Sequence, residues 1–550
     1  MLFLRTSRHT ATQRPRCSNF EHEAPVKCGP FSLTSWPMAP KAARVVGKRP
    51  AGGMCKHPAK RSKTGCVNVL SQFLECALEK LSKPQLDRLC QHLQDKFTVS
   101  SACTGSGMAE VVHAELTRML KLPSEVAFSC EKVKSKREFY MSVVSPHLSV
   151  HGCMFDDMTS LPDLVAQCSV HGHACRVPTG TSLHVCGFSC KDLSKLNNNW
   201  TPAQKATVLQ KQLGSSGKTF AALTNFANKA KPKIMILENV DELEDKGEPN
   251  PNLDFLYEVM SAVGYSMGQK TLVSMNFGLP QGRKRVYFVC IHNESFGLNP
   301  SRGQALVERI IQQVDVMQCA TESMYHFLLP PGHPHLVQEL EESESKMAPG
   351  SSSSATAGWL AEHEALFKSK GIAWKDMQPS RLLANSPWYR KLTRRKRESL
   401  NYHIFRVHQV GDIVKGPTTT LDLSQSIARA SAGYKGICQT LTPKMCTWMF
   451  AHDADADAEG DDEVASAKLP QPGRPMLGIE AMMIQGFPGD WLLSRPGGCP
   501  PNTQLLDLAG NAFSSTVFAA VYMSVLAELP KPVKRPSSSG DLEAIFQALL

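Results

Sequence analysis

The chain has 550 residues, of which 42% are hydrophobic and 20% are charged, and its formal net charge is +11. This composition indicates a soluble globular protein with a sizeable core. No apolar run approaches the roughly 20 residues that span a bilayer, so we expect no membrane segment. The excess of Lys and Arg favours a polyanionic partner, and lysines spread over a solvated surface are the alternative explanation.

The 18 cysteines form no CxxC pair, and no secretory leader precedes a compact disulfide framework. We therefore interpret them as reduced thiols of an intracellular protein. Cys168, His171, His173 and Cys175 form one local cluster of ligand types at close spacing. A zinc site and a plain surface loop after a helix both fit this cluster, and the surface loop is the favoured interpretation, so no metal is predicted.

Residues 1–65 are polar, basic and poor in acids, which predicts a disordered N-terminal tail. Lys48 and Arg49 form a basic pair, and a second basic cluster at residues 60–63 follows after ten residues. This arrangement resembles a bipartite nuclear localisation signal and favours the nucleus. The alternatives are a solvated tail that binds nucleic acid loosely and an organellar transit peptide over the first twenty residues.

Residues 66–96 predict a helical extension, because apolar side chains recur at helical spacing and Pro84 divides the run into two helices. Strand patterns then alternate with helical stretches. Strands are expected at 97–103, 126–130, 150–155, 182–187, 233–237, 270–275 and 285–291. The alternation predicts an α/β domain whose mostly parallel sheet has helices on both faces, with the last two strands as a hairpin at one edge.

The ends of the first three expected strands carry the features of a nucleoside site. The first strand leads into a turn in which Gly105 and Gly107 allow the backbone to approach a ligand. Glu131 follows the second strand, where a carboxylate can accept both hydroxyls of a ribose, and Asp156 and Asp157 follow the third. NAD and S-adenosylmethionine both fit this pattern.

The later strands end in groups that suit covalent chemistry. Cys190 follows a short apolar run on the loop that leaves the carboxyl end of a buried strand, which is the position of a nucleophile. Glu238 and Asn239 reach the same edge, and Arg283 and Arg285 alternate at the start of the last strand. Each residue has a structural explanation by itself, but their order on one sheet favours a catalytic site.

Together these motifs resemble those of the cytosine-5 DNA methyltransferase family. The matching segments are CTGSGM from Cys103 to Met108, GFSC ending at Cys190, ENV from Glu238, QGRKR from Gln281, TLTP from Thr440, RPMLGIEAMMIQGFP from Arg474 and LAGNAF from Leu508. They span residues 97–291 and 430–527. The resemblance implies a Rossmann-like sheet of the S-adenosylmethionine-dependent methyltransferases with a smaller target-recognition domain.

The resemblance also implies roles for individual residues. The Cys190 thiolate, with its pKa depressed by nearby positive charge, adds to carbon 6 of a flipped cytosine in DNA so that carbon 5 accepts a methyl group. Glu238 holds ring nitrogen 3, Asn239 fixes the loop, and Arg283 or Arg285 binds the base oxygen or the adjacent phosphate. S-adenosylmethionine is expected to contact Cys103, Thr104, Gly105, Gly107, Met108, Glu131, Asp156, Asp157 and Asn511.

The chain departs from the family pattern around the nucleophile. Ser189 and Lys191 stand where the family usually has proline and glutamine, and Ser101 and Cys103 replace the usual Asp and Phe of the cofactor turn. The polar stretch from residue 191 to residue 218 is expected to be a long loop that closes behind the base. It contains GSSGKT, which follows no strand and lacks the first glycine of a phosphate-binding loop.

The match divides the chain into a catalytic first part at 97–292, a target-recognition region at 293–430, a catalytic completion at 431–528 and a tail at 529–550. Basic residues crowd beside Trp388 and Tyr389 in the recognition region. This interleaving suits contact with phosphates, and a solvated helix face is the alternative. The acidic stretch at 452–463 predicts a loop insertion without the spacing of a calcium-binding loop.

Two other functions remain open from the sequence. An RNA cytosine-5 methyltransferase shares the fold and chemistry, but the chain lacks the CFT-type signature of the tRNA-directed branch. A methyltransferase-like module without activity, which only binds nucleic acid or a protein partner, agrees with the altered residues around Cys190. The favoured function is DNA cytosine-5 methylation, because the nucleophile, the carboxylate and the arginines are all present.

Overall fold

The computed structural model describes residues 66–194, 197, 199–244, 250–321, 323–345, 356–410, 418–428, 431–450 and 473–530. The predicted basic tail, the acidic insertion at 452–463 and the tail after residue 530 lie outside the described residues.

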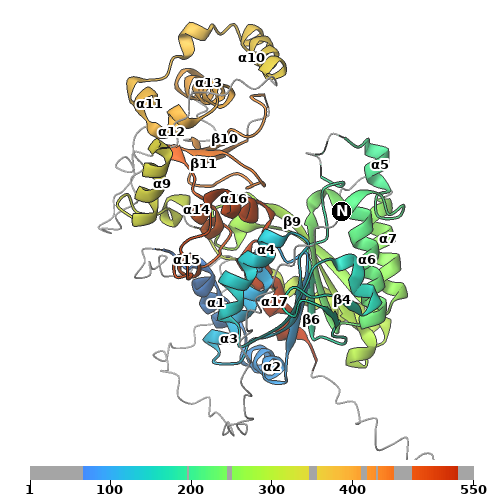
Figure 1. Ribbon diagram of the computed structural model, residues 1–550. Coiled ribbons are helices and arrows are strands. Elements are labelled where there is room, and N and C mark those ends of the chain that lie inside the picture. The colour runs from blue at the N-terminus through green and yellow to red at the C-terminus, as the bar shows by residue number, and fades with distance from the viewer. Residues whose placement is uncertain are drawn as a thin grey trace, which may run out of the picture. The chain divides into compact units, whose positions relative to one another are not determined.

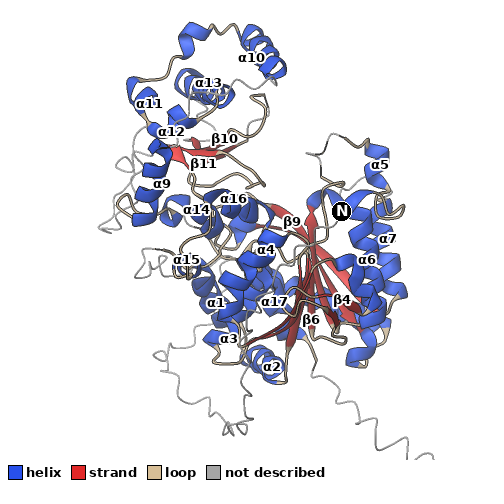
Figure 2. Ribbon diagram, in the orientation of Figure 1, coloured by secondary structure: helices blue, strands red, loops and turns tan. Residues whose placement is uncertain are grey.

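A seven-stranded sheet forms the centre of the fold, and Figure 2 shows its strands between flanking helices. Its strands are β1 (Thr98–Ala102), β2 (Glu125–Cys130), β3 (Val150–Phe155), β6 (Leu183–Cys186), β7 (Ile234–Val240), β8 (Tyr265–Val273) and β9 (Lys284–His292). Their order is β3-β2-β1-β6-β7-β9-β8. Strand β9 is antiparallel to both of its neighbours, β7 and β8, and the other strand pairs are parallel. The predicted mostly parallel α/β sheet with an edge hairpin is therefore confirmed.

Helices cover both faces of this sheet, as the alternation of side chains requires. Along β7, Ile234 and Ile236 enter one core, whereas Met235 and Leu237 enter the other. The first core includes α1 (Val69–Lys80), α3 (Met108–Met119) and α17 (Ser515–Glu528). The second includes α6 (Gly214–Ala230) and α7 (Pro251–Ala262), which lie on the opposite side of the sheet (Figure 1).

The order of the strands creates a switch point between β1 and β6. The chain passes from β1 to β2 and β3 on one side and then returns to β6 on the other side of β1. Ala102 pairs with Cys186, and Cys186 pairs with Leu237. The residues that follow each strand therefore leave the sheet at one edge, and such switch points form ligand-binding crevices.

The remaining α-helices, together with the two strands β4 and β5, lie outside the seven-stranded sheet. They are α2 (Lys83–Gln94), α4 (Lys134–Phe139), β4 (Val165–Gln167), β5 (Ala174–Arg176), α5 (Pro202–Ala206), α8 (Pro300–Val316), α9 (Pro334–Ser345), α10 (Thr356–Lys370), α11 (Arg381–Asn385), α12 (Pro387–Lys391), α13 (Arg394–Val410), α14 (Gly478–Ile484), α15 (Gly489–Leu493) and α16 (Asn502–Asn511).

The structure corrects two predicted boundaries of the target-recognition region. Helix α8 packs against β8 and α17, and a Cβ atom added at Gly268 would lie 2.6 Å from Val307. The boundary at residue 293 therefore separates a helix from the sheet that it covers. A second sheet has the order β11 (Ala432–Tyr434), β10 (Thr418–Asp422), β12 (Thr447–Met449) and β13 (Arg474–Pro475), so the boundary at residue 430 falls within a sheet.

Helix α17 brings the end of the described chain back against α3, the helix that follows the turn with Gly105 and Gly107. Tyr522 hydroxyl and His113 Nδ1 lie 3.0 Å apart and join α17 to α3. No single helix in the described residues is long and apolar enough to cross a membrane, although α16 and α17, bent by 42°, pass that test as a pair. Residues 515–527 of α17 are all buried inside the protein.

A buried ion pair joins β13 to α14. Arg474 Nη2 lies 2.6 Å from Glu480 Oε1, Nη1 donates to Oε2 at 2.8 Å, and both side chains are at most 2% exposed. Glu480 also accepts hydrogen bonds from the amides of Leu329 and Leu477. The pair therefore connects the second sheet, α14 and the segment near Leu329.

We expect Arg474→Met to lower the free energy of unfolding by about 3–5 kcal/mol, because it leaves the buried Glu480 carboxylate without its countercharge. Lys83 and Asp87 form a matched control, since they are 3.2 Å apart and their side chains are 75% and 48% exposed. Lys83→Met should change the same free energy by less than about 1 kcal/mol. Urea denaturation of both variants measures the difference, and similar midpoints would contradict it.

Candidate active site

The turn between β1 and α3 has a left-handed backbone at Cys103, Gly105 and Gly107, with φ angles of +54°, +58° and +73°. A Cβ atom at Gly107 would lie 2.8 Å from the Tyr140 ring, so packing requires glycine there. A Cβ atom at Gly105 would meet only the Cys103 carbonyl oxygen, at 3.8 Å. The turn therefore leaves open space at Gly105, where a ligand can approach the backbone.

Glu131 connects the ends of β1 and β2. Its carboxylate accepts hydrogen bonds from the amide of Gly105 at 2.9 Å and from the amide of Val133 at 2.8 Å. The Thr104 hydroxyl makes a second connection, because it donates to the Cys130 carbonyl at 3.1 Å. Carboxylate oxygens have further lone pairs, so Glu131 can still accept the hydroxyls of a ribose beside the turn.

The two aspartates after β3 have different surroundings. Asp156 Oδ1 lies 3.3 Å from Arg137 Nε and accepts a hydrogen bond from Ser169. Asp157 accepts from the amide of Thr159 at 3.0 Å, and its other oxygen lies 2.8 Å from Lys132 Nζ. Asp157 therefore caps the short helix that follows, while Asp156 remains at the end of the strand.

Met108 and Asn511, which are also predicted to contact the cofactor, differ in burial. Met108 begins α3 and is 1% exposed in the first core. Asn511 is exposed at the end of α16, and its side-chain amide donates to the Asp507 carbonyl at 2.8 Å. Among the described residues, Asn511 has no hydrogen bond to the glycine turn.

Gly187 and Asn239 shape the loop that carries Cys190. A Cβ atom at Gly187 would lie 2.7 Å from the Phe513 ring and 3.7 Å from Glu238 Oε2, so the missing side chain allows these groups to approach β6. The buried Asn239 amide donates to the Phe188 carbonyl at 3.0 Å. Asn239 thus fixes the backbone immediately before the nucleophile.

Serine residues hold the part of the loop where the family has proline. The Ser189 amide donates to the Thr219 hydroxyl at 3.1 Å, and the Ser189 and Ser215 hydroxyls lie 2.8 Å apart. Asp192 accepts a hydrogen bond from the Ser216 amide at 2.8 Å. GSSGKT therefore starts α6 and anchors the nucleophile loop, so the prediction of one continuous loop to residue 218 was wrong.

The two arginines at the start of β9 differ in their contacts. Arg285 Nε lies 3.3 Å from Glu238 Oε1, and its side chain is 18% exposed. Arg283 is 4% exposed and donates to the carbonyls of Leu441 at 3.2 Å and Gly510 at 3.4 Å. Arg285 therefore faces the candidate catalytic groups directly, whereas Arg283 joins β9 to two later segments of the chain.

Burial dominates the ionisation of the site. It raises the pKa of the Cys190 thiol, the Glu238 charge adds to this rise, and Arg285 and Arg283 oppose it. The expectation of a depressed thiol pKa was therefore wrong, because desolvation outweighs the two positive charges. Burial likewise raises the pKa of Glu238 against the same two arginines. Burial and the charge of Arg285 lower the pKa of Arg283 to about 10.

The predicted basic and aromatic surface is basic but not aromatic. Trp388 and Tyr389 are 9% and 6% exposed because they pack into the first core. Arg395 donates to the carbonyls of Gln425 at 2.8 Å and Leu423 at 3.1 Å. Basic side chains at positions 390, 391 and 394 remain exposed, so they can contact phosphates, but ring stacking on the two aromatic residues is excluded.

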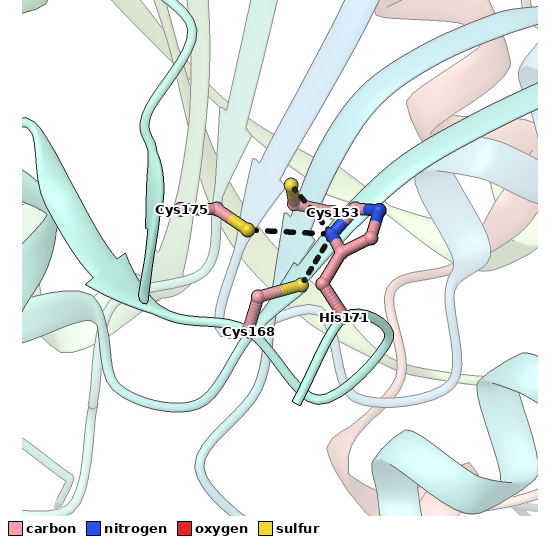
Figure 3. Close-up of side chains that lie close together, drawn as sticks. All are labelled: Cys153, Cys168, His171 and Cys175. Carbon is pink, nitrogen blue, oxygen red and sulfur yellow. Dashed lines mark hydrogen bonds between the residues drawn. The ribbon is translucent and has the colours of Figure 1, made fainter. Parts of the chain in front are cut away.

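A cluster beside β3 contains a residue that the sequence analysis missed. Cys153 joins Cys168, His171 and Cys175 (Figure 3), and one ligand atom of each lies within 4.8 Å of the others. The predicted surface loop is present, because residues 169–173 are exposed, but it connects β4 to β5 and does not follow a helix directly. Sequence spacing gave no signal for Cys153, which lies on a different strand.

We expect Glu238→Gln to move the pH dependence of Cys190 alkylation to lower pH, because it removes the negative charge that raises the thiol pKa. Arg285→Met should move it to higher pH for the opposite reason. Iodoacetamide labelling across pH 7–10, followed on the Cys190 peptide by mass spectrometry, measures both shifts. Cys90 in α2 provides the control curve, and unchanged Cys190 curves in both variants would contradict the coupling.

Comparisons with known proteins agree with this arrangement. The sequence profile described as "C-5 cytosine-specific DNA methylase" matches residues 183–526. A protein named DNA (cytosine-5-)-methyltransferase DMT5 from Cryptococcus neoformans var. grubii is 24% identical over 534 residues, which cover 91% of this chain and 20% of that protein. The protein of the same name from Verticillium dahliae is 23% identical, covering 80% of this chain and 20% of its own length.

The bacterial relatives match a shorter segment. Type II methyltransferase M.HhaI of Haemophilus parahaemolyticus is 30% identical over 96 residues, which are 17% of this chain and 29% of that enzyme. The chain thus spans about a fifth of the length of the two fungal relatives. Because the family profile covers more than half of its residues, the chain belongs to the C-5 cytosine-specific DNA methylase family.

Proposed function

We propose that this protein transfers a methyl group from S-adenosylmethionine to carbon 5 of cytosine in DNA through a covalent adduct with Cys190. One observation carries this proposal: Cys190 follows β6, Glu238 lies near the carboxyl end of the neighbouring strand β7, and Arg285 Nε lies 3.3 Å from Glu238 Oε1. The two fungal relatives are named as DNA methyltransferases, which supports DNA rather than RNA as the substrate.

The glycine turn fits S-adenosylmethionine as the cofactor. The open space at Gly105 and the Glu131 carboxylate, 2.9 Å from the Gly105 amide, suit a nucleoside, and Asp156 suits its adenine. Pairing of Ala102 with Cys186 places this turn next to the nucleophile loop. When bound, the cofactor supplies an electrophilic methyl group.

Cys190 and Glu238 would activate the base together. The target cytosine leaves the duplex stack, because its ring cannot otherwise be reached. The Cys190 thiolate forms a bond to carbon 6 while protonated Glu238 donates to nitrogen 3, so electron density moves to carbon 5. The raised pKa of Glu238 supports its role as the proton donor. Once it has lost this proton, the carboxylate faces the positive charge of Arg285.

The reaction then returns the sulfur to its starting state. Carbon 5 would accept the methyl group as the bond between this group and the cofactor sulfur breaks, with the electron pair left on that sulfur. A base would then remove the proton from carbon 5, the bond between carbon 6 and the Cys190 sulfur would break, and the proton on nitrogen 3 would return to Glu238. The products are 5-methylcytosine, the demethylated cofactor and one proton.

Arg283 acts as a positioning residue, because its hydrogen bonds hold Leu441 and Gly510 beside β9. Basic residues 48–63 support a nuclear location for this reaction.

Trapping on 5-fluorocytosine tests the covalent step. In a DNA duplex, fluorine replaces the proton that must leave carbon 5, so the adduct should persist in denaturing electrophoresis when S-adenosylmethionine is present. Cys190→Ser should abolish the adduct, Cys90→Ser should retain it, and Glu238→Gln should slow its formation by about 10²–10⁴-fold. An adduct with RNA but not with DNA would identify RNA as the substrate. The absence of any adduct would contradict the proposal.

Two glycine variants separate cofactor binding from folding. Gly107→Ala should lower the free energy of unfolding by about 2–4 kcal/mol, because its Cβ atom would collide with Tyr140 in a left-handed backbone. Gly105→Ala should cost about 1 kcal/mol of stability but lose most S-adenosylmethionine binding, because its Cβ atom enters the open space. Calorimetric titration with the cofactor measures binding, and wild-type affinity in Gly105→Ala would contradict this location.

A further inference from the structure

Three cysteines and one histidine converge beside β3, as Figure 3 shows. Cys153 lies in β3, Cys175 lies in β5, and Cys168 and His171 lie in the connection from β4 to β5. His171 Nδ1 lies 3.6 Å from the sulfur of Cys153, 3.4 Å from that of Cys168 and 3.3 Å from that of Cys175. One nitrogen therefore faces three sulfur atoms.

These distances match the edges of a metal tetrahedron. Zinc bonds of about 2.3 Å to sulfur and about 2.0 Å to nitrogen, at tetrahedral angles, give a separation of about 3.5 Å between sulfur and nitrogen. Three thiolates and one imidazole are ligands that zinc prefers. All three cysteines are free thiols, so no disulfide competes for the sulfur atoms.

The local backbone holds this arrangement. The Cys168 amide donates to the His173 carbonyl at 3.0 Å, and the Gly172 amide donates to the Cys168 carbonyl at 2.9 Å. These hydrogen bonds close a tight turn. Within it the potential ligands have the spacing Cys-x2-His-x3-Cys, and short spacings of this kind are typical of zinc ligands. The His173 Nδ1 lies 2.9 Å from the Ala174 carbonyl and 3.7 Å from the Cys175 sulfur, and this ring is not among the four groups whose ligand atoms lie within 4.8 Å of one another.

We propose that Cys153, Cys168, His171 and Cys175 bind one structural zinc ion. The protein fills all four positions of the tetrahedron, which distinguishes a structural site from a catalytic site with an open position. Binding releases the protons of the three thiols to solvent and forms four bonds to the metal. The site goes beyond the methyl-transfer function and does not depend on it.

The zinc ion connects a short hairpin to the edge of the main sheet. Strand β3 is the edge strand, and β4 pairs with β5 in a separate two-stranded sheet. The Ser169 amide donates to the Met154 carbonyl at 2.8 Å, and the Ser169 hydroxyl donates to Asp156. The metal thus covers an exposed strand edge and fixes the turn whose Ser169 positions the predicted adenine-binding carboxylate.

Elemental analysis of the full chain, purified without chelators and without a histidine tag, tests this proposal. We expect about one zinc ion per chain, and loss of most of it in the double variant Cys168→Ser/Cys175→Ser. Cys90→Ser, a partly buried cysteine outside the cluster, should retain the full content. Cobalt substitution should produce the thiolate charge-transfer absorption in wild type and Cys90→Ser but not in the double variant.

Two variants at His171 preserve the test if the double variant does not fold. His171 is exposed, so His171→Ala should fold but lose zinc to a chelator at least ten times faster than wild type. His171→Cys restores four ligands and should retain the metal. A wild-type chain with less than about one tenth of a zinc ion, or equal zinc in wild type and the double variant, would overturn the proposal. The methyltransferase proposal would be unaffected by either result.

Discussion

The carboxyl group of Glu238 is the constraint on which the catalytic edge depends, because its side chain is only 12% exposed and its charge acts on Cys190. Cys190 and Glu238 both have a raised pKa, and ionisation of one opposes ionisation of the other. Two such groups titrate as a coupled pair. Arg283 and Arg285 oppose both rises in pKa, so their positive charges favour the ionised form of either group.

The sheet register places the strand ends next to which these groups lie. Ala102, Cys186 and Leu237 are paired across β1, β6 and β7, and the next residue of each strand enters the site. Antiparallel β9 enters from the opposite direction, with Arg285 paired to Val240. One row of backbone hydrogen bonds therefore positions the cofactor turn, the nucleophile loop and the carboxylate together.

The central sheet was predictable because apolar runs of four to nine residues, separated by turn signals, identify buried strands. The edge location of Cys190 and Glu238 followed from the same patterns. The thiol pKa was predicted in the wrong direction, because a sequence shows nearby positive charge but not burial. The contacts of Ser189 with α6 and the approach of Cys153 to Cys168 could not be predicted, since they join residues whose separation in the sequence carries no periodic signal.

The contacts of Arg283 have a consequence for the order in which the protein matures. Its carbonyl acceptors, Leu441 and Gly510, come 158 and 227 residues later in the chain. On the ribosome, a nascent chain can pair β1, β6, β7 and β9 well before either acceptor has been synthesised. The guanidinium group then lacks the carbonyls that bury it in the finished fold. The positive charge of Arg283, which opposes the raised pKa of Cys190, therefore reaches its final position only when the segments around Leu441 and Gly510 have folded against the central sheet.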